Sequence, residues 1–118
     1  MPIVTIHALP PKESKQIGTT LIEVAKKLAS ALNTSSSNVW VHFEPIVDFC
    51  EGETIPSQSD YHPVVTVLAN PRSEEAISRG LESIATAVAS GLGLDRKNIW
   101  IHWIDLPHGR VYADGQVR

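Results

Sequence analysis

Apolar and polar residues alternate with two different periods along the first part of the chain. From Ile3 to Ala8 the period is two, which is typical of a strand with one buried face. From about Glu13 to Leu32 the apolar residues recur at helical spacing and form one stripe, made of Ile17, Leu21, Val24, Ala25, Leu28 and Leu32. The two-residue period returns from Val39 to Ile46. The pattern predicts a strand, a helix and a second strand.

The second half of the chain repeats this unit. The stretch NVWVHF (residues 38–43) returns as NIWIHW (residues 98–103), and the same offset of about 60 residues relates the apolar stripes of the two predicted helices. When the first strands of the two repeats are aligned with a further shift of one residue, Pro2 corresponds to Pro63. We therefore expect a single domain, residues 1–118, made of two β-α-β repeats at about 2–47 and 63–107. A linker at about 48–62 and a C-terminal hairpin at about 108–118 complete it.

Local signals mark the ends of the second helix and the turn of the hairpin. Ser73 is followed by two glutamates, which is typical of a helix N-cap with favourable charges in the first turn. Gly91 and Gly93 predict the end of this helix. The pair Asp114-Gly115 is typical of a tight hairpin turn.

The repeat predicts an α+β fold with a four-stranded mixed sheet and two helices on one face. Two strands that are joined by a helix run parallel across a right-handed crossover. The alternation then places Trp40 and His42, and equally Trp100 and His102, on the face that no helix covers. Matched tryptophans on an uncovered face are typical of an interface or a pocket. We therefore expect an oligomer.

The composition narrows the class of protein. Of the 118 residues 42% are hydrophobic and 19% are charged, and the net charge is -3. No apolar run approaches the roughly 18 residues that a membrane span needs, and the scattered Lys and Arg form no basic stripe for nucleic acid. The chain begins without the pattern of a secretory signal, and Cys50 is the only cysteine. We expect a cytoplasmic protein that binds neither nucleic acid nor membranes.

The histidines do not predict a metal site. His42 and His102 occupy equivalent positions of the two repeats, but a metal ion needs three or four converging ligands. The other histidines, His7, His62 and His108, show no ligand spacing. We expect neither a metal nor a cofactor.

The start MP running into a strand, together with the doubled β-α-β unit, resembles the tautomerase superfamily, which includes 4-oxalocrotonate tautomerase, the chloroacrylic acid dehalogenases, malonate semialdehyde decarboxylase and macrophage migration inhibitory factor. The resemblance covers nearly the whole chain. The stretch DRKNIWIHWIDLP (residues 95–107) is similar to the matching part of cis-3-chloroacrylic acid dehalogenase, and YADGQ near the C-terminus is similar to small bacterial members. The resemblance implies a homotrimer in which six units assemble, and a small carboxylate as the substrate.

The resemblance also implies that Met1 is removed and that the Pro2 amine acts as general base or acid. An α-amino group has a pKa near 8, and burial beside cations lowers it further. A partly neutral amine can take a proton from a carbon next to a carbonyl and return it elsewhere. The nitrogen of Pro63 is an amide without basicity. The sequence therefore predicts at most one such site in each chain.

Other site residues follow from the same resemblance. Arg72 lies where the dehalogenase and the tautomerase have a carboxylate-binding arginine, and Lys12 is its counterpart in the first repeat. His102 lies where the dehalogenase has a tyrosine and could exchange a hydrogen bond with substrate. Trp40 and Trp100 lie where the tautomerase has its second arginine, so they are candidates for substrate contact.

The C-terminal stretch adds three candidates. The dehalogenase's acidic residue aligns near Asp114, and Arg110 and Tyr112 lie in the same stretch, which is equally typical of a hairpin without function. Pro2 as a plain strand start and Arg72 as a solvated residue ahead of a helix are the corresponding alternatives. The function expected from the sequence is a cofactor-independent isomerase or lyase for a small keto or unsaturated carboxylate. The alternative is a non-catalytic protein of the same fold that serves in assembly or in binding a small ligand.

Overall fold

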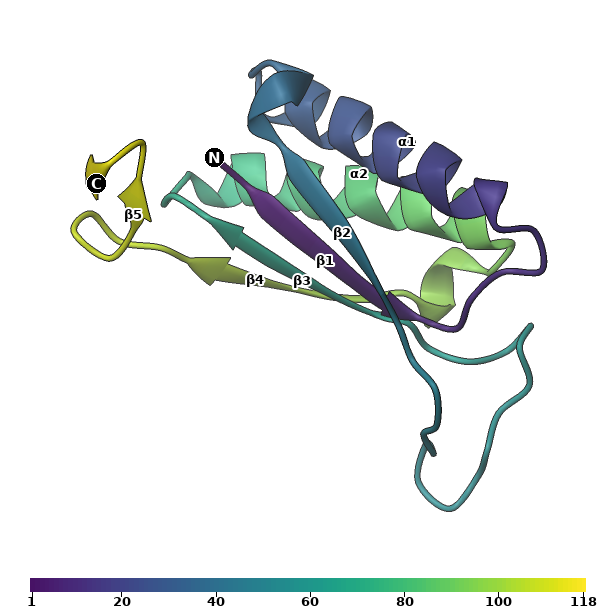
Figure 1. The fold of residues 1–118 in the computed structure, drawn as a ribbon. Helices are drawn as coiled ribbons and strands as arrows, with labels where there is room; N and C mark the ends of the chain where they lie inside the picture. Colours follow the sequence, from purple (N-terminus) through teal and green to yellow (C-terminus); the bar gives the residue numbers. More distant parts are fainter.

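The computed structural model describes residues 1–118 and contains the predicted repeat (Figure 1). Strand, helix and strand occur twice and a short hairpin follows. The elements are β1 Ile3–Ala8, α1 Lys15–Ala31, β2 Trp40–Pro45, β3 Val64–Ala69, α2 Glu74–Leu92, β4 Trp100–Asp105, β5 Tyr112–Ala113 and β6 Gln116–Val117. A turn of 3-10 helix precedes each second strand, at Ser36–Asn38 and Arg96–Asn98.

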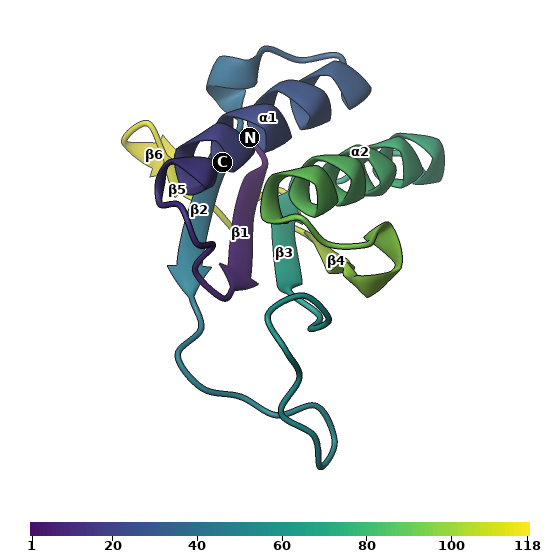
Figure 2. The same cartoon turned by 90° about the vertical axis from the view of Figure 1, so that its right-hand side faces the viewer.

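The four longer strands form one mixed sheet in the order β2-β1-β3-β4. β1 pairs in parallel with β2, and β3 with β4, whereas the central strands β1 and β3 are antiparallel. Both helices lie on the same face of this sheet (Figure 2), so the predicted fold class is confirmed. Because the central pair is antiparallel, equivalent strand ends of the two repeats lie at opposite ends of the sheet.

The core lies between the sheet and the two helices. Every second residue of β1 and β3 is fully buried, because strand side chains alternate between the two faces. The helices bury the apolar stripes that face the sheet. The fully buried residues of this core include Val4, Ile6, Val24, Leu28, Val65, Val67, Ile84 and Val88. Neither helix has the length and apolar character that a membrane crossing requires.

Both ends of α2 are capped. The Ser73 hydroxyl accepts a hydrogen bond from the Ala76 N–H at 3.2 Å, as its N-cap position predicts. The helix ends at Gly93, whose φ of 68° lies in the left-handed region that glycine adopts without strain. The Leu94 N–H then donates to the Ala89 carbonyl at 2.9 Å, which satisfies one carbonyl of the last turn.

The predicted end of α2 at Gly91 and Gly93 is confirmed, because the helix ends at Leu92, but Gly91 also has a second role. It lies inside the helix, where a Cβ would be 2.0 Å from the Oγ1 atom of Thr20 on α1. Gly80, further along α2, is similarly close to neighbours, since a Cβ there would be 2.9 Å from a ring carbon of Trp103. These two glycines let α2 approach α1 and β4 more closely than any other residue would allow.

The face of the sheet without helices, called the open face below, carries a polar row between apolar side chains. The strand register aligns His42, Thr5, Thr66 and His102 across all four strands. The Nε2 atom of His102 lies 3.1 Å from the Thr66 Oγ1, and the Trp100 indole N–H donates to its Nδ1 at 3.2 Å. Because an indole N–H can only donate, the Nδ1 atom of His102 is the acceptor in this contact.

Candidate active site

The start of the chain lies beside the end of β3. Antiparallel pairing of the central strands sets Ile3 opposite Leu68, so Met1 and Pro2 lie next to the residues that follow β3. Pro2 is fully buried, and its carbonyl accepts a hydrogen bond from the Trp40 N–H at 3.0 Å. The position of Pro2 is therefore fixed by both packing and backbone bonding.

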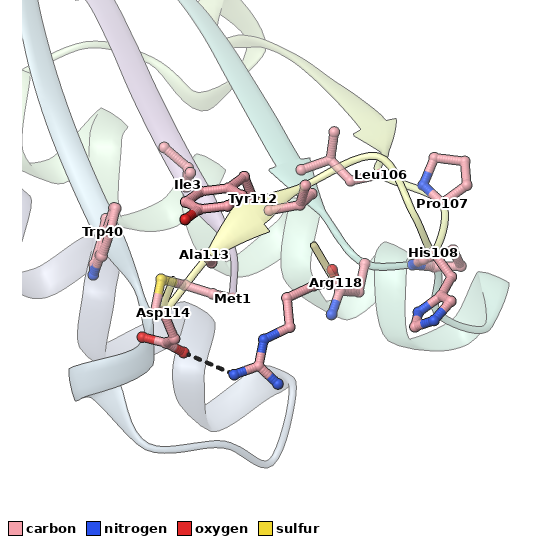
Figure 3. Close-up of a pocket in the computed structure, with 13 residues that line it drawn as sticks. Met1, Ile3, Trp40, Leu106, Pro107, His108, Tyr112, Ala113, Asp114 and Arg118 are labelled. Carbon is pink, nitrogen blue, oxygen red and sulfur yellow. Dashed lines mark hydrogen bonds and ion pairs between the residues drawn. The ribbon is translucent and has the colours of Figure 1, made fainter. Parts of the chain in front are cut away.

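A pocket of about 490 Å³ opens at this end of the sheet (Figure 3). Its wall comes from the starts of β1 and β2, from the loop after β3 and from the C-terminal segment. More than half of the lining residues are apolar, and the lining includes Met1, Ile3, Trp40, Tyr112, Asp114 and Arg118. An apolar pocket with a few convergent polar groups is the usual form of a small-molecule site.

The C-terminal hairpin closes one side of this pocket. Asp114 and Gly115 form its turn, with φ values of 53° and 77°, so both residues have the left-handed backbone of a tight turn. The predicted hairpin turn is thus present. Its residues Tyr112 and Asp114 line the pocket together with Trp40. The structure brings these three predicted substrate-binding residues to the same end of the sheet as Pro2.

Arg72 acts on the amino group at the start of the chain. The pKa of the Met1 amino group is lowered from its ordinary value of 8.0. Burial is the larger cause, and the positive charge of Arg72 is the smaller one. Both effects disfavour the ammonium form. The Nε atom of Arg72 is buried without a hydrogen-bond partner, but Arg72 is not part of the pocket wall.

Four other predicted residues lie away from this pocket within the chain. Lys12 follows the far end of β1, and Trp100 pairs with Val64 at that same far end. His102 is in the middle of the open face, where Thr66 and Trp100 occupy its two ring nitrogens. Arg110 is exposed in the C-terminal segment and does not line the pocket.

Pro63, the equivalent of Pro2, lies at the far end of the sheet, where neither the chain start nor the C-terminal hairpin is present. The Pro63 carbonyl accepts from the Trp100 N–H at 3.1 Å, as Pro2 does from Trp40. The chain preceding Pro63 is the linker, which projects from this end (Figure 1). Tyr61 of the linker is buried, and burial raises the pKa of its phenol from 10.0. Only the Pro2 end therefore offers an amino group.

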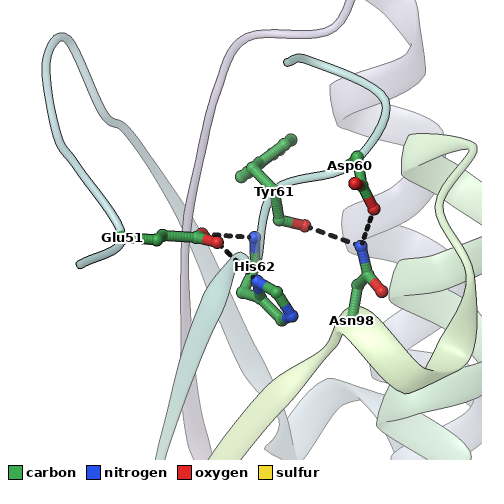
Figure 4. A network of polar contacts seen from close by, with 5 residues as sticks. All are labelled: Glu51, Asp60, Tyr61, His62 and Asn98. Carbon is green, nitrogen blue, oxygen red and sulfur yellow. Dashed lines mark hydrogen bonds and ion pairs between the residues drawn. The ribbon is translucent and has the colours of Figure 1, made fainter. Parts of the chain in front are cut away.

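Polar contacts fix this linker to the second repeat (Figure 4). The Asn98 side-chain amide donates to the Tyr61 carbonyl at 3.2 Å and to Asp60 at 3.3 Å. The Glu51 carboxylate accepts from the His62 N–H at 2.8 Å and contacts its ring Nδ1 at 2.7 Å. The backbone bond to His62 is the largest cause that lowers the pKa of Glu51. The two ends of the sheet are therefore built differently.

Sequence reasoning missed Arg118 as a site residue. Its guanidinium lines the pocket and pairs with Asp114 at 3.3 Å. The signal was an arginine four residues after an acidic residue, across a predicted Asp-Gly turn, which brings the two side chains near each other. Met1 was also missed as a lining residue, since its side chain contributes to the pocket wall.

Several solved structures have the same fold as this chain, although their sequences are only weakly similar to it. A fused 4-OT wild-type asymmetric trimer superimposes with a TM-score of 0.88 at 11% identity, over 98% of this chain and 94% of that chain. Pt0534 inactivated by 2-oxo-3-pentynoate gives a TM-score of 0.83 at 12% identity, over 98% and 94%. A member of the cis-3-chloroacrylic acid dehalogenase family gives 0.74 at 16% identity, over 98% and 82%.

Sequence comparison alone finds no relative: no protein-family model and no curated protein matches the chain. The agreement of fold extends over nearly the full length of the chain and of the fused 4-OT structure. It includes the doubled unit on which the sequence resemblance depended. The chain therefore has the fold of the tautomerase superfamily, in its two-repeat form.

Proposed function

We propose that this protein, after removal of Met1, is a cofactor-independent isomerase or lyase of the tautomerase type. Its substrate is a small keto or unsaturated carboxylate, and the Pro2 amine is the general base. The observation that carries this proposal is the Met1 amino group, which has a lowered pKa and belongs to a residue that lines a mostly apolar pocket, next to Pro2. The neighbouring structures of 4-OT and of the dehalogenase family support the reaction class.

Removal of Met1 moves the terminal amine one residue inward, to the fully buried position of Pro2. We expect burial and the charge of Arg72 to disfavour the ammonium form of Pro2, as they do for the Met1 amino group. A larger fraction of Pro2 amines is then neutral near pH 7 than of solvent-exposed α-amino groups. Loss of the Met1 side chain also widens the pocket in front of it.

The reaction step needs no electrons from outside. The neutral Pro2 nitrogen takes a proton from a carbon next to the substrate's carbonyl, and the electrons of the broken C–H bond move into the enolate. The resulting ammonium returns a proton to a different carbon or to the same one. Arg72 favours the neutral base before the step, because it raises the free energy of the protonated one.

Deuterium exchange tests this proposal. With 2-oxobutanoate in D2O, the processed chain should accelerate exchange at the carbon next to the keto group, followed by proton NMR. The control is the same chain acetylated at Pro2, whose amide nitrogen has no basicity. Equal acceleration by both forms would contradict Pro2 as the base.

A second candidate function is that of a non-catalytic, ligand-binding protein of this fold. The observation that favours it is Met1, which lines the pocket and, where retained, acylates Pro2. The intact mass of the purified protein distinguishes the two. A retained Met1 would leave the pocket as a binding site only.

We also propose a homotrimer that buries the open face. Trp40 and Trp100 are 52% and 61% exposed in the single chain, and Ile104 on the same face is 45% exposed. At about 25 cal/mol per Å² of apolar area, covering these side chains stabilises an assembly by several kcal/mol. The fused 4-OT structure is a trimer, which supports the same assembly here.

A further inference from the structure

The last residue of the chain is held firmly by its backbone. The Arg118 N–H donates to the Val111 carbonyl at 2.7 Å, and the Arg118 carbonyl accepts from the Gly109 N–H. These two bonds close the hairpin on the segment that precedes it. Arg118 is thus presented to the pocket by a fixed backbone and not by a loose terminus.

The guanidinium of Arg118 has donors to spare. Its only side-chain partner is Asp114, through one Nη atom at 3.3 Å (Figure 3). Both side chains are more than half exposed, at 52% and 82%. An exposed pair of this kind contributes little stability, so an incoming anion can displace the Asp114 carboxylate at small cost.

Charge in the pocket wall is otherwise sparse. Among the thirteen lining residues, Arg118 is the only arginine or lysine and Asp114 the only acidic residue. Arg72 lies outside the wall, although its charge reaches the terminal amine. The two arginines are therefore placed for different tasks.

We propose that Arg118 is the residue that selects a carboxylate ligand in this pocket. This inference rests on the proposed function for the position of the reacting carbon, but the binding itself does not need a basic Pro2. The planar guanidinium accepts a carboxylate through two parallel hydrogen bonds. Asp114 occupies the guanidinium while the pocket is empty and is replaced when the ligand enters.

The class of ligand follows from the side chains that line the pocket between Arg118 and the start of the chain. A carboxylate at Arg118 places the rest of the molecule against the side chains of Ile3, Trp40 and Tyr112 and toward Met1, whose removal leaves the Pro2 amine at the chain start. The pocket therefore fits a carboxylate with an apolar body that carries its keto or unsaturated carbon toward the amine. Arg72 in this arrangement adjusts the amine and does not bind the carboxylate.

Equilibrium binding tests the inference without any reaction. The probes are 2-oxobutanoate and its neutral amide, titrated into the processed chain and followed by NMR shifts of residues in the pocket. Replacing Arg118→Gln should weaken binding of the acid roughly 10- to 100-fold relative to the amide, because one charge-assisted pair is lost. Arg118→Lys should retain part of the preference, and Asp114→Asn should increase it by removing the competing carboxylate.

A matched control is Arg96→Gln, which removes an arginine paired with Glu82 on the helical side of the molecule. It should leave the ratio of acid to amide binding unchanged. If Arg118→Gln weakens both probes equally, Arg118 supports the hairpin only and the inference is wrong. If Arg72→Gln and not Arg118→Gln removes the preference, the carboxylate lies at Arg72.

The failures of the two proposals are distinguishable. Loss of deuterium exchange activity with an intact acid preference at Arg118 would contradict the role of Pro2 and leave the binding inference standing. Exchange that depends on Pro2, with no acid preference at Arg118, would contradict the inference alone.

Discussion

Trp40 and Trp100 hold equivalent positions in the two repeats, but Trp40 lines the pocket at the Pro2 end of the sheet and Trp100 does not. Each donates its backbone N–H to the carbonyl of a buried proline, Pro2 at 3.0 Å and Pro63 at 3.1 Å. The antiparallel central strands place the two tryptophans at opposite ends of the sheet. One end receives the chain start and the C-terminal hairpin, and the other receives the linker. The duplication is therefore symmetric in fold and asymmetric in chemistry.

Removing the charge of Arg72 should raise the pKa of the terminal amine. In the processed Arg72→Gln variant, the rate at which Pro2 reacts with an electrophile should reach half its maximum at a higher pH than in the wild type. The reason is that Arg72 lowers the pKa by disfavouring the ammonium form. The rate is measured against pH with a neutral reagent, so that binding of a carboxylate plays no part.

At a pH well above both midpoints the amine is neutral in both proteins, and the two rates should converge. Unchanged midpoints would mean that Arg72 does not act on the amine. A uniform slowing at every pH would instead indicate a structural role for Arg72.

Two glycine substitutions should change stability in opposite directions. Gly91→Ala places a Cβ 2.0 Å from Thr20 Oγ1 and should lower the free energy of unfolding by about 1–3 kcal/mol. Gly18 lies in α1, where an added Cβ would meet no atom within 4 Å. Gly18→Ala should therefore raise the free energy of unfolding by up to about 1 kcal/mol, the difference in helix propensity. Urea unfolding followed by circular dichroism measures both. A gain in stability from Gly91→Ala would refute the close approach of the helices.

Assembly should depend on the open face and not on the helical face. Ile104→Lys places a charge on the open face and should convert the trimer to monomers, measured by light scattering at micromolar concentration. The matched control is Ile22→Lys on α1, whose side chain is 59% exposed and lies on the other side of the sheet. It should leave the mass of the particle unchanged. A wild-type protein that is already monomeric would contradict the proposed trimer.

The sequence was sufficient for the fold because the repeat made each pattern visible twice. The two-residue period of Ile3–Ala8 and the helical stripe that followed specify which face of each element is buried. That alternation also placed Trp40, Trp100 and His102 correctly on the open face. Periodicity indicates, however, on which face of the sheet a side chain lies, and not at which end of the sheet the residue lies.

The site was therefore predicted only in part. That Trp100 lies at the end of the sheet opposite to Pro2 follows from the antiparallel pairing of β1 and β3, which is a long-range contact without a local signal. The spacing of Asp114 and Arg118 indicates that the two side chains lie near each other, but not that the hairpin brings them to the pocket at the Pro2 end of the sheet. Gly91 and Gly93 marked the end of α2 correctly, but the close contact of Gly91 with Thr20 was missed, because glycine is typical of both helix ends and close helix contacts.

The central claim is that the Pro2 amine is the reactive group of this protein, and covalent labelling tests it most directly. The purified protein is treated near pH 7 with less than one equivalent of 2-oxo-3-pentynoate, the reagent named for the inactivated Pt0534 structure. The neutral amine adds to the alkyne carbon remote from the ketone. A C–N bond forms, one π bond breaks, and the N–H proton moves to the neighbouring carbon.

Mass spectrometry of the intact protein and of its peptides reads out this experiment. The account predicts a chain without Met1 that gains the mass of one reagent molecule on Pro2. The lysines should remain unlabelled, because an amine with a pKa near 10.4 is less than about 0.1% neutral at pH 7. A chain that retains Met1, or label spread over lysines with Pro2 unmodified, would contradict the account.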